Sequence, residues 1–197
     1  MTLPKYVAPK PRALMNFFWP TSWMVSDPER FNALIKEAAS LCEGGIHFAD
    51  NLFTWARNNS LFDDAAFREA WEKNVVNDAD RAVAWRRYFL ATLAYHAVQL
   101  PGDFVECGVY AGTGVKPVMD YLGGKDFPKP FWAYDTYDYN PVEGHAFDGQ
   151  RPGFFEEVTK RFEGYANVRL VKGLIPASFA GACPEAIAYL HIDLNNA

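Results

Sequence analysis

The sequence predicts an α/β fold, with a doubly wound parallel sheet that follows a helical N-terminal region. Two observations support this prediction. From residue 103 onward, short runs of strand-forming residues alternate with helical segments, and this alternation implies parallel strands joined by right-handed crossovers. The first of these runs also ends on an acid and leads directly into a glycine-rich turn, a feature of many α/β proteins.

The first hundred residues are predicted to be helical. Ser26 and Glu29 form a capping-box pattern, and apolar residues follow at helical spacing as far as the glycine pair 44–45. A second helical stretch is predicted over 47–58 and a third from Asp63, and both carry large aromatic residues. We interpret these short helices as packing against a neighbouring domain. The alternative is a cap that shapes a substrate pocket.

A longer fourth helix is capped by Asn77 and ends at Pro101-Gly102. Its apolar residues recur with a period near 3.6, at Ala82, Trp85, Phe89, Leu93, Ala97 and Leu100. Because this helix leads straight into the first strand, we do not expect two independent parts. The predicted division is a helical extension or cap over 1–76 and a sheet domain over 77–197.

The sheet domain contains four predicted strands, at 103–107, 131–135, 168–172 and 186–194. Helical segments are expected between them, at 113–122, from Pro152 and, as a short turn, at 175–179. The fourth strand is an almost continuous apolar run, of the kind that parallel sheets bury. If it ended the sheet, it would leave an exposed apolar edge.

The turn after the first strand reads Glu-x-Gly-x-x-x-Gly-x-Gly from Glu106 to Gly114. A strand, a glycine-rich turn and a helix start are the arrangement with which α/β proteins hold a nucleotide-like cofactor. The spacing is neither the G-x-G-x-x-G of dinucleotide sites nor that of a phosphate-binding P-loop. Asp135 ends the second strand, where an acid accepts hydrogen bonds from ribose hydroxyls. The alternative for Asp135 is a solvated loop acid.

The stretch from Glu106 to Gly114 resembles the first motif of class I S-adenosylmethionine (SAM) dependent methyltransferases, which have a Rossmann-like fold. The longer string Gly-Asp-Phe-Val-Glu-Cys-Gly-Val-Tyr-Ala-Gly, at 102–112, resembles the macrocin O-methyltransferase-like branch, whose members methylate sugar hydroxyls on natural products. The resemblance implies a SAM-dependent O-methyltransferase that acts on a hydroxyl of a small molecule. The cofactor-binding residues that we predict are Glu106, Gly108, Tyr110, Gly112, Asp135, Thr136 and Gly173.

The resemblance also assigns a role to Asp193, at the carboxyl end of the fourth strand. It implies that Asp193 is the catalytic residue facing the methyl group and the first ligand of a Mg²⁺ site. The family usually places a second acid two residues later, and some members have a histidine after it, where this chain has Asn195 and Asn196. Asparagine binds a hard cation through its carbonyl but cannot act as a base. Metal dependence is therefore in doubt, and the general base is unassigned.

A complete sheet of this class has seven strands, in the order 3-2-1-4-5-7-6. The four strands found here indicate the N-terminal part of a longer domain, or a short relative whose edge a partner covers. Two other functions stay open. One is a non-catalytic, methyltransferase-like binding module, and the other is a fragment of a nicotinamide-dependent oxidoreductase. In the long loop at 136–152, Asp138 and His145 are the plausible acid/base pair.

Composition excludes several other classes of protein. A net charge of −5 without a Lys/Arg cluster argues against a nucleic-acid surface. No apolar stretch approaches the roughly 20 residues that a membrane span needs. Cys42, Cys107 and Cys183 lack metal-ligand spacing and are expected to be reduced, buried thiols. We therefore expect a cytoplasmic protein that binds a small hydroxylated substrate, with a homo-oligomer left open.

Overall fold

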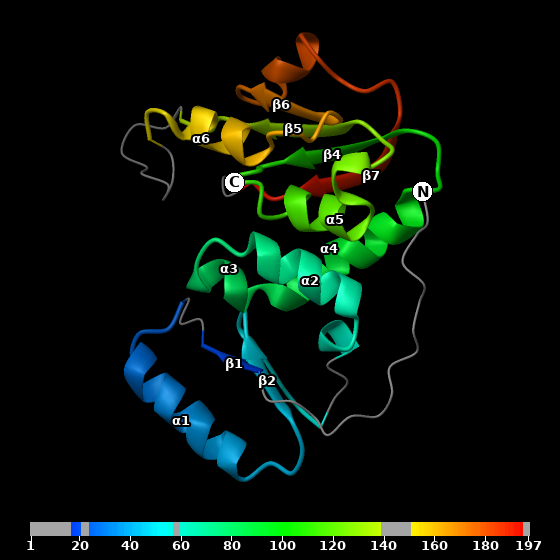
Figure 1. The fold of residues 1–197 in the computed structure, drawn as a ribbon. Helices are drawn as coiled ribbons and strands as arrows, with labels where there is room; N and C mark the ends of the chain where they lie inside the picture. Colours follow the sequence, from blue (N-terminus) through cyan, green and yellow to red (C-terminus); the bar gives the residue numbers. More distant parts are fainter. Residues whose placement is uncertain (1–16, 21–23, 57–59, 139–150, 195–197) are drawn as a thin grey trace. The chain divides into compact units, whose positions relative to one another are not determined.

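The computed structural model describes residues 17–20, 24–56, 60–138 and 151–194 (Figure 1). The chain divides into two compact units, one reaching Tyr88 and the other starting at Phe89. The division falls within helix α4 (Ala84–Ala97), which follows the predicted boundary at residue 76. We call the two parts the N-terminal unit and the sheet unit.

The sheet unit contains four parallel strands, as the sequence predicted. They are β4 (Asp103–Cys107), β5 (Phe131–Asp135), β6 (Val168–Lys172) and β7 (Ile187–Ile192). Their order in the sheet is β6-β5-β4-β7 (Figure 1), and every neighbouring pair is parallel. The chain therefore has a Rossmann-like α/β fold.

The two faces of this sheet are covered unequally. One face packs against α4, α5 (Val115–Tyr121) and α6 (Phe154–Arg161) in a core that includes Phe104, Phe131 and Tyr189. On the opposite face, Val105, Cys107, Trp132 and Tyr134 pack against residues of 175–182, which contain the 3₁₀ turn η3 (Ala177–Ala180). Leu190 and Ile192 of β7 remain 51% and 61% exposed. Among the described strands β7 is the last in the sheet, and these two apolar side chains are exposed on one of its faces.

The N-terminal unit contains a second, smaller sheet, which the sequence did not predict. Its strands are β1 (Phe17–Trp19), β2 (Ile46–Ala49) and β3 (Leu52–Trp55), in the order β1-β2-β3. β1 is parallel to β2, and β2 is antiparallel to β3. The helical elements of this unit are α1 (Pro28–Ser40), α2 (Ala65–Asn74), α3 (Asp78–Ala82) and the 3₁₀ turn η1 (Ser60–Phe62).

The predicted helix over 47–58 is wrong, because this segment contains most of the β2–β3 hairpin. Asp50 and Asn51 form its two-residue turn with φ angles of 51° and 57°, the left-handed conformation that tight hairpins require. The apolar residues that suggested a helix lie on two strands instead. Phe48 pairs with Phe53 across the hairpin, with ring centroids 6.2 Å apart. The expectation that the first hundred residues are all helical is therefore wrong as well.

The other predicted helices are present, with two changes. Asp27, not Ser26, caps α1, and its side chain accepts a hydrogen bond from the backbone N–H of Arg30 at 3.0 Å. The predicted fourth helix is two helices, because Val83 leaves the helical conformation between α3 and α4. Asn77 caps the first of them, as predicted.

The buried face of α4 differs from the predicted apolar stripe. Phe89 and Leu93 belong to the predicted apolar stripe but are 63% and 46% exposed. Ala97 of the stripe is buried, and the other buried residues of α4 are Ala84, Leu90, Ala91 and Ala94.

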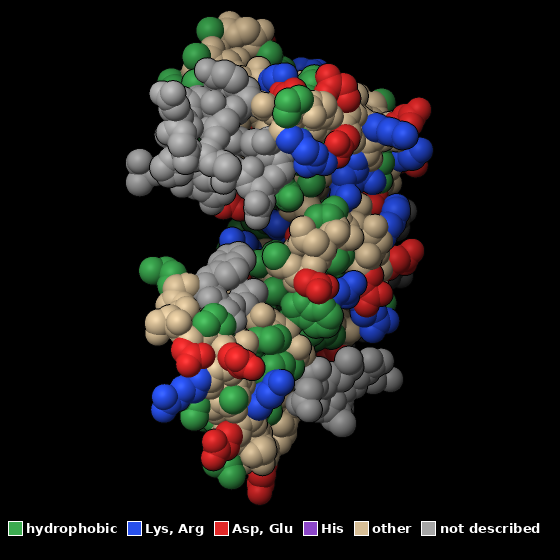
Figure 2. Space-filling model, turned by 90° about the vertical axis from the view of Figure 1, so that its left-hand side faces the viewer, with side chains coloured by type: hydrophobic (Ala, Val, Ile, Leu, Met, Phe, Trp, Pro, Cys, Tyr) green, Lys and Arg blue, Asp and Glu red, His purple; other side chains and the backbone are tan. Residues whose placement is uncertain are grey.

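The described surface carries charges of both signs. On the face in Figure 2, basic and acidic side chains are interspersed over the described residues. Cys42, Cys107 and Cys183 are free thiols, but only Cys107 is buried and Cys183 is exposed, so the expectation of three buried thiols is wrong. Within the described ranges, no helix has both the length and the hydropathy to cross a membrane.

Candidate functional site

The candidate site lies at the carboxyl edge of the sheet, where the chain changes direction. From β4 the chain proceeds through β5 to β6 on one side, and β7 then pairs with the other side of β4. The helices α5 and α6, which follow β4 and β5, cover one face of the sheet, and the segment between β6 and β7 covers the other. Open α/β sheets bind ligands in the crevice at such a switch point. The carboxyl ends of β4 and β7 are therefore where a ligand is expected.

Glu106 is a buried acid near the end of β4. Its side chain is 3% exposed, and Oε2 makes no hydrogen bond with any described residue. The carboxylate lies against Gly114, where a Cβ atom would be 2.5 Å from Oε1 and 2.7 Å from Oε2. Gly114 is thus the residue that makes room for the acid, although its own φ of −86° suits any residue. A buried carboxylate oxygen without a partner is costly unless a ligand supplies one.

Gly108 directly follows β4 and lies against the end of β7. Its φ of 88° is left-handed, and a Cβ atom there would overlap the backbone carbonyl oxygen of Asp193. The N–H of Asp193 donates to the carbonyl of Cys107 at 2.8 Å, which continues the β4–β7 ladder by one residue. Asp193 is half-buried and follows β7 directly. The structure therefore places Asp193 beside the glycine turn, as the sequence predicted.

Asp135 ties the glycine turn to the end of β5. Its Oδ2 accepts hydrogen bonds from the backbone N–H groups of Val109 and Tyr110, both at 2.7 Å. Its Oδ1 accepts a third from the N–H of Tyr137 at 2.8 Å. Asp135 is therefore not a solvated loop acid. The Thr136 hydroxyl makes a longer contact with Oδ1, so each oxygen accepts two bonds and a ribose hydroxyl would take the place of the Thr136 hydroxyl at Oδ1.

The remaining predicted residues lie at the same edge. Tyr110 is 38% exposed, with a left-handed φ of 50°. Gly112 packs against the ring of Phe162, and Thr136 places its hydroxyl 3.5 Å from Asp135 Oδ1. The N–H of Gly173, after β6, donates to the carbonyl of Asp135 at 2.9 Å. The fold thus gathers all of these residues at the ends of four strands, and their ligand roles stay predictions.

Burial and the nearby acids keep two neighbouring groups neutral. Burial, together with the charges of Asp135 and Glu106, raises the pKa of Tyr137 well above its ordinary value. The Tyr137 hydroxyl is buried and donates to the carbonyl of Ala133 at 3.0 Å. Burial and the Glu106 charge also raise the pKa of the Cys107 thiol. Neither group is suited to be a base at neutral pH.

The predicted acid/base pair in the loop can be placed only in part. Asp138 forms an ion pair with Lys172 at the end of β6, and the hydrogen bond from Lys172 lowers the pKa of Asp138. His145 lies outside the described residues, as do Asn195 and Asn196. Within the described ranges, no group of three or more His, Cys, Asp or Glu side chains could hold a metal ion. The described residues thus supply Asp193 alone toward the predicted Mg²⁺ site.

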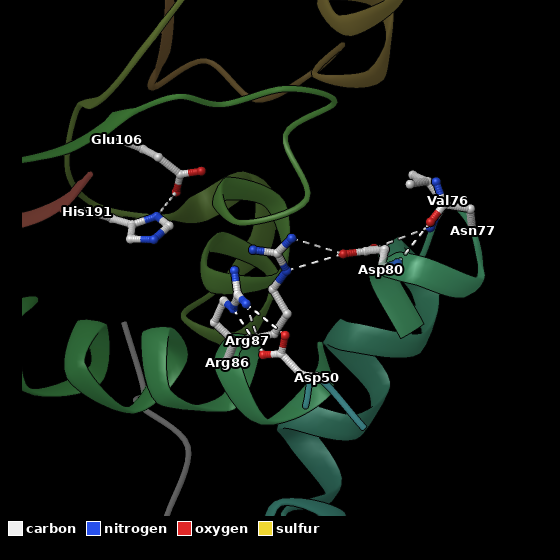
Figure 3. Close-up of polar contacts among 8 residues, drawn as sticks. All are labelled: Asp50, Val76, Asn77, Asp80, Arg86, Arg87, Glu106 and His191. Carbon is white, nitrogen blue, oxygen red and sulfur yellow. Dashed lines mark hydrogen bonds and ion pairs between the residues drawn. The ribbon is translucent and has the colours of Figure 1, made fainter. Parts of the chain in front are cut away.

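His191 is a residue of the site that the sequence did not predict. It is the register partner of Glu106 across the β4–β7 pair, and its Nδ1 lies 3.2 Å from Glu106 Oε2 (Figure 3). The distance is that of an ion pair, but the geometry does not meet that of a hydrogen bond. A polar residue within the apolar run of the fourth strand was the available signal. Its meaning depended on a strand register that the sequence does not show.

Comparison with known proteins adds one partial likeness. No protein-family model matches the chain, and no curated protein matches it. Among solved structures, the O-methyltransferase NovP aligns with 55% of this chain, at 23% sequence identity and a TM-score of 0.43. The aligned part covers 52% of the NovP chain, so the match spans about half of each protein. A likeness at this level does not assign a function to this chain.

Proposed function

We propose that this chain is a SAM-binding methyltransferase domain that transfers a methyl group to a hydroxyl of a small molecule. The observation that supports the proposal best is the placement of Glu106, Asp135 and Asp193 at one sheet edge around the glycine turn. SAM carries a sulfonium and an ammonium group, and a crevice bordered by three acids favours such a cation. An edge of this kind suits SAM better than an anionic dinucleotide.

The residues fit the parts of the cofactor that each would hold. The buried carboxylate of Glu106 is an acceptor for the ammonium group, and Asp135 suits a ribose hydroxyl at Oδ1, in place of the Thr136 hydroxyl. Gly173 lies beside Asp135 and would border the adenine. The cofactor supplies the reactive methyl carbon, and the protein contributes binding, orientation and electrostatics.

Asp193 is the candidate acid nearest the chemistry. The hydroxyl oxygen of the substrate forms the new bond to the methyl carbon while the carbon–sulfur bond breaks, and the hydroxyl proton must leave. A carboxylate at the Asp193 position would accept that proton, and such a base contributes about 10²- to 10⁴-fold in rate. We propose Asp193 as this base and derive no step through a metal ion.

Calorimetric titration of the chain with SAM, S-adenosylhomocysteine and NAD tests the proposal. We expect binding of the first two and none of NAD. Asp135→Asn and Glu106→Gln should each weaken SAM at least about tenfold, since each removes a charged hydrogen-bond acceptor. The matched control is Asp126→Asn, an exposed acid of the same unit, which should bind SAM like the wild type. Binding of NAD alone, or equal SAM affinity in all variants, would contradict the proposal.

A further inference from the structure

We infer that His191 is the positioning residue for Glu106, holding its carboxylate through Nδ1 in the orientation that receives the ammonium group of the cofactor. The inference rests on the proposed function, because it requires a cationic group at this edge. It starts from the strand register. Glu106 and His191 are direct partners on β4 and β7, and two residues earlier the rings of Phe104 and Tyr189 stack at 4.9 Å. All four side chains therefore share the face that packs against α5.

The contact between the two polar side chains is close and buried. Nδ1 of His191 lies 3.2 Å from Oε2 of Glu106, and the side chains are 15% and 3% exposed (Figure 3). No described residue makes a hydrogen bond to either of these two atoms. Two buried polar atoms that approach each other without a hydrogen bond either serve a function or lower the stability of the fold.

The surroundings of the carboxylate explain why it needs a partner. Gly114 limits it on one side, as the close approach of both oxygens to the missing Cβ shows. The terminal torsion of a glutamate is broad, so one wall does not fix its plane. A donor on the adjacent strand selects one orientation and thereby decides which oxygen is left for a ligand. Sites of this kind keep their geometry only when a supporting residue locks the contacting one.

Packing alone does not account for a histidine at this place. The alternate residues Leu190 and Ile192 point to the other face of β7, so His191 occupies a helix-side position where an apolar residue would pack without desolvating a polar ring. The neighbouring helix-side residue Tyr189 is buried in the apolar core. His191 lies where the apolar core ends, next to Glu106. Its ring is therefore placed to act on the Glu106 carboxylate.

Two substitutions separate a positioning role from a packing role. In His191→Asn the amide nitrogen takes the place of Nδ1, whereas in His191→Gln it takes the place of Nε2. We expect His191→Asn to bind SAM within about threefold of the wild type. His191→Gln should bind it at least about tenfold more weakly, because it removes the nitrogen that lies next to the Glu106 carboxylate. 5′-Methylthioadenosine lacks the amino-acid end of SAM, and its affinity should be the same in both variants and the wild type.

A second measurement uses the Glu106→Gln background. If His191 acts through the carboxylate, adding His191→Gln there should change SAM affinity less than twofold. His96→Gln is the matched control, because His96 is an exposed histidine of the same unit. Thermal unfolding of each variant confirms that folded proteins are compared.

The outcomes are distinct. Equal losses in His191→Asn and His191→Gln, or a parallel loss of 5′-methylthioadenosine, would show a packing role and overturn the inference. Unchanged SAM affinity in His191→Gln would overturn it as well. If the wild type itself fails to bind SAM, the proposed function fails, and that result differs from wild-type binding with an unaffected His191→Gln.

Discussion

Two acids, one in each unit of this chain, are held by different means. At the edge of the sheet unit, Asp135 is held by three backbone N–H groups. In the N-terminal unit, Asp80 is held by the guanidinium of Arg87, and buried His47 has no hydrogen-bond partner for either ring nitrogen among the described residues. Asp135 therefore depends on backbone geometry alone among these contacts, whereas Asp80 depends mainly on the Arg87 side chain, with one longer bond from the N–H of Val76, and His47 depends on aromatic packing.

Gly108→Ala tests the backbone side of this comparison and should have the largest effect. A left-handed φ costs a residue with a Cβ about 1–2 kcal/mol, and relieving an overlap with a backbone carbonyl costs about as much again or more. We expect the free energy of unfolding to fall by about 4 kcal/mol in urea denaturation. Gly181→Ala is the control, because nothing lies within 4 Å of its Cβ position. A loss below about 1 kcal/mol for Gly108→Ala would contradict the role of this turn.

Arg87→Met tests side-chain pairing in the N-terminal unit. The Nη2 atom of Arg87 lies 3.0 Å from Asp80 Oδ1, and the two side chains are 11% and 7% exposed. Removing one partner of a buried ion pair leaves the other charge uncompensated, so we expect a loss of about 3 kcal/mol in the same assay. The neighbouring Arg86 pairs with Asp50 at 2.8 Å but is exposed (Figure 3). Arg86→Met should therefore cost only about 0.5 kcal/mol. Equal losses in the two variants would show that burial does not set the strength of these pairs.

The difference between the units also decided what the sequence could predict. Buried parallel strands are marked by apolar runs, and an acid followed by spaced glycines marks the first turn, so all four strands were predicted. Their order was expected only from the resemblance to class I methyltransferases. The hairpin at 46–55 was missed because Phe48, Leu52 and Trp55 recur at helical spacing. The pair Asp50-Asn51 was the turn signal that should have outweighed that spacing.

For the candidate site, the sequence predicted positions along the chain but not contacts across it. Each strand end could be found, and therefore Glu106, Asp135 and Asp193 could be named. The two hydrogen bonds from the glycine turn to Asp135 depend on how that turn folds back. The contact between Glu106 and His191 depends on the register of β4 against β7. Neither follows from local patterns, because both are set by packing between distant segments.

The pH dependence of stability tests the contribution of the buried His47 in the N-terminal unit. His47, on β2, is 2% exposed and its ring stacks on Phe17 with centroids 5.0 Å apart. Burial lowers the pKa of His47 below its ordinary value of 6.5, and the charge of Asp50 opposes part of this effect. The unfolded chain therefore binds a proton at a higher pH than the folded chain. The neutral His47 ring makes its full contribution to stability above about pH 6.5. This contribution is lost as the pH falls toward the pKa of His47 in the folded chain.

Urea denaturation of the wild type and His47→Phe at pH 7.5 and 5.5 measures this loss. A single proton contributes at most about 1.4 kcal/mol per pH unit, so the wild type should lose up to that amount below pH 6.5. His47→Phe keeps an aromatic ring between its neighbours and cannot take up a proton, so its loss should be smaller by that difference. His96→Gln, an exposed histidine, should follow the wild type. If His47→Phe loses as much stability as the wild type, the buried ring is not what acid attacks.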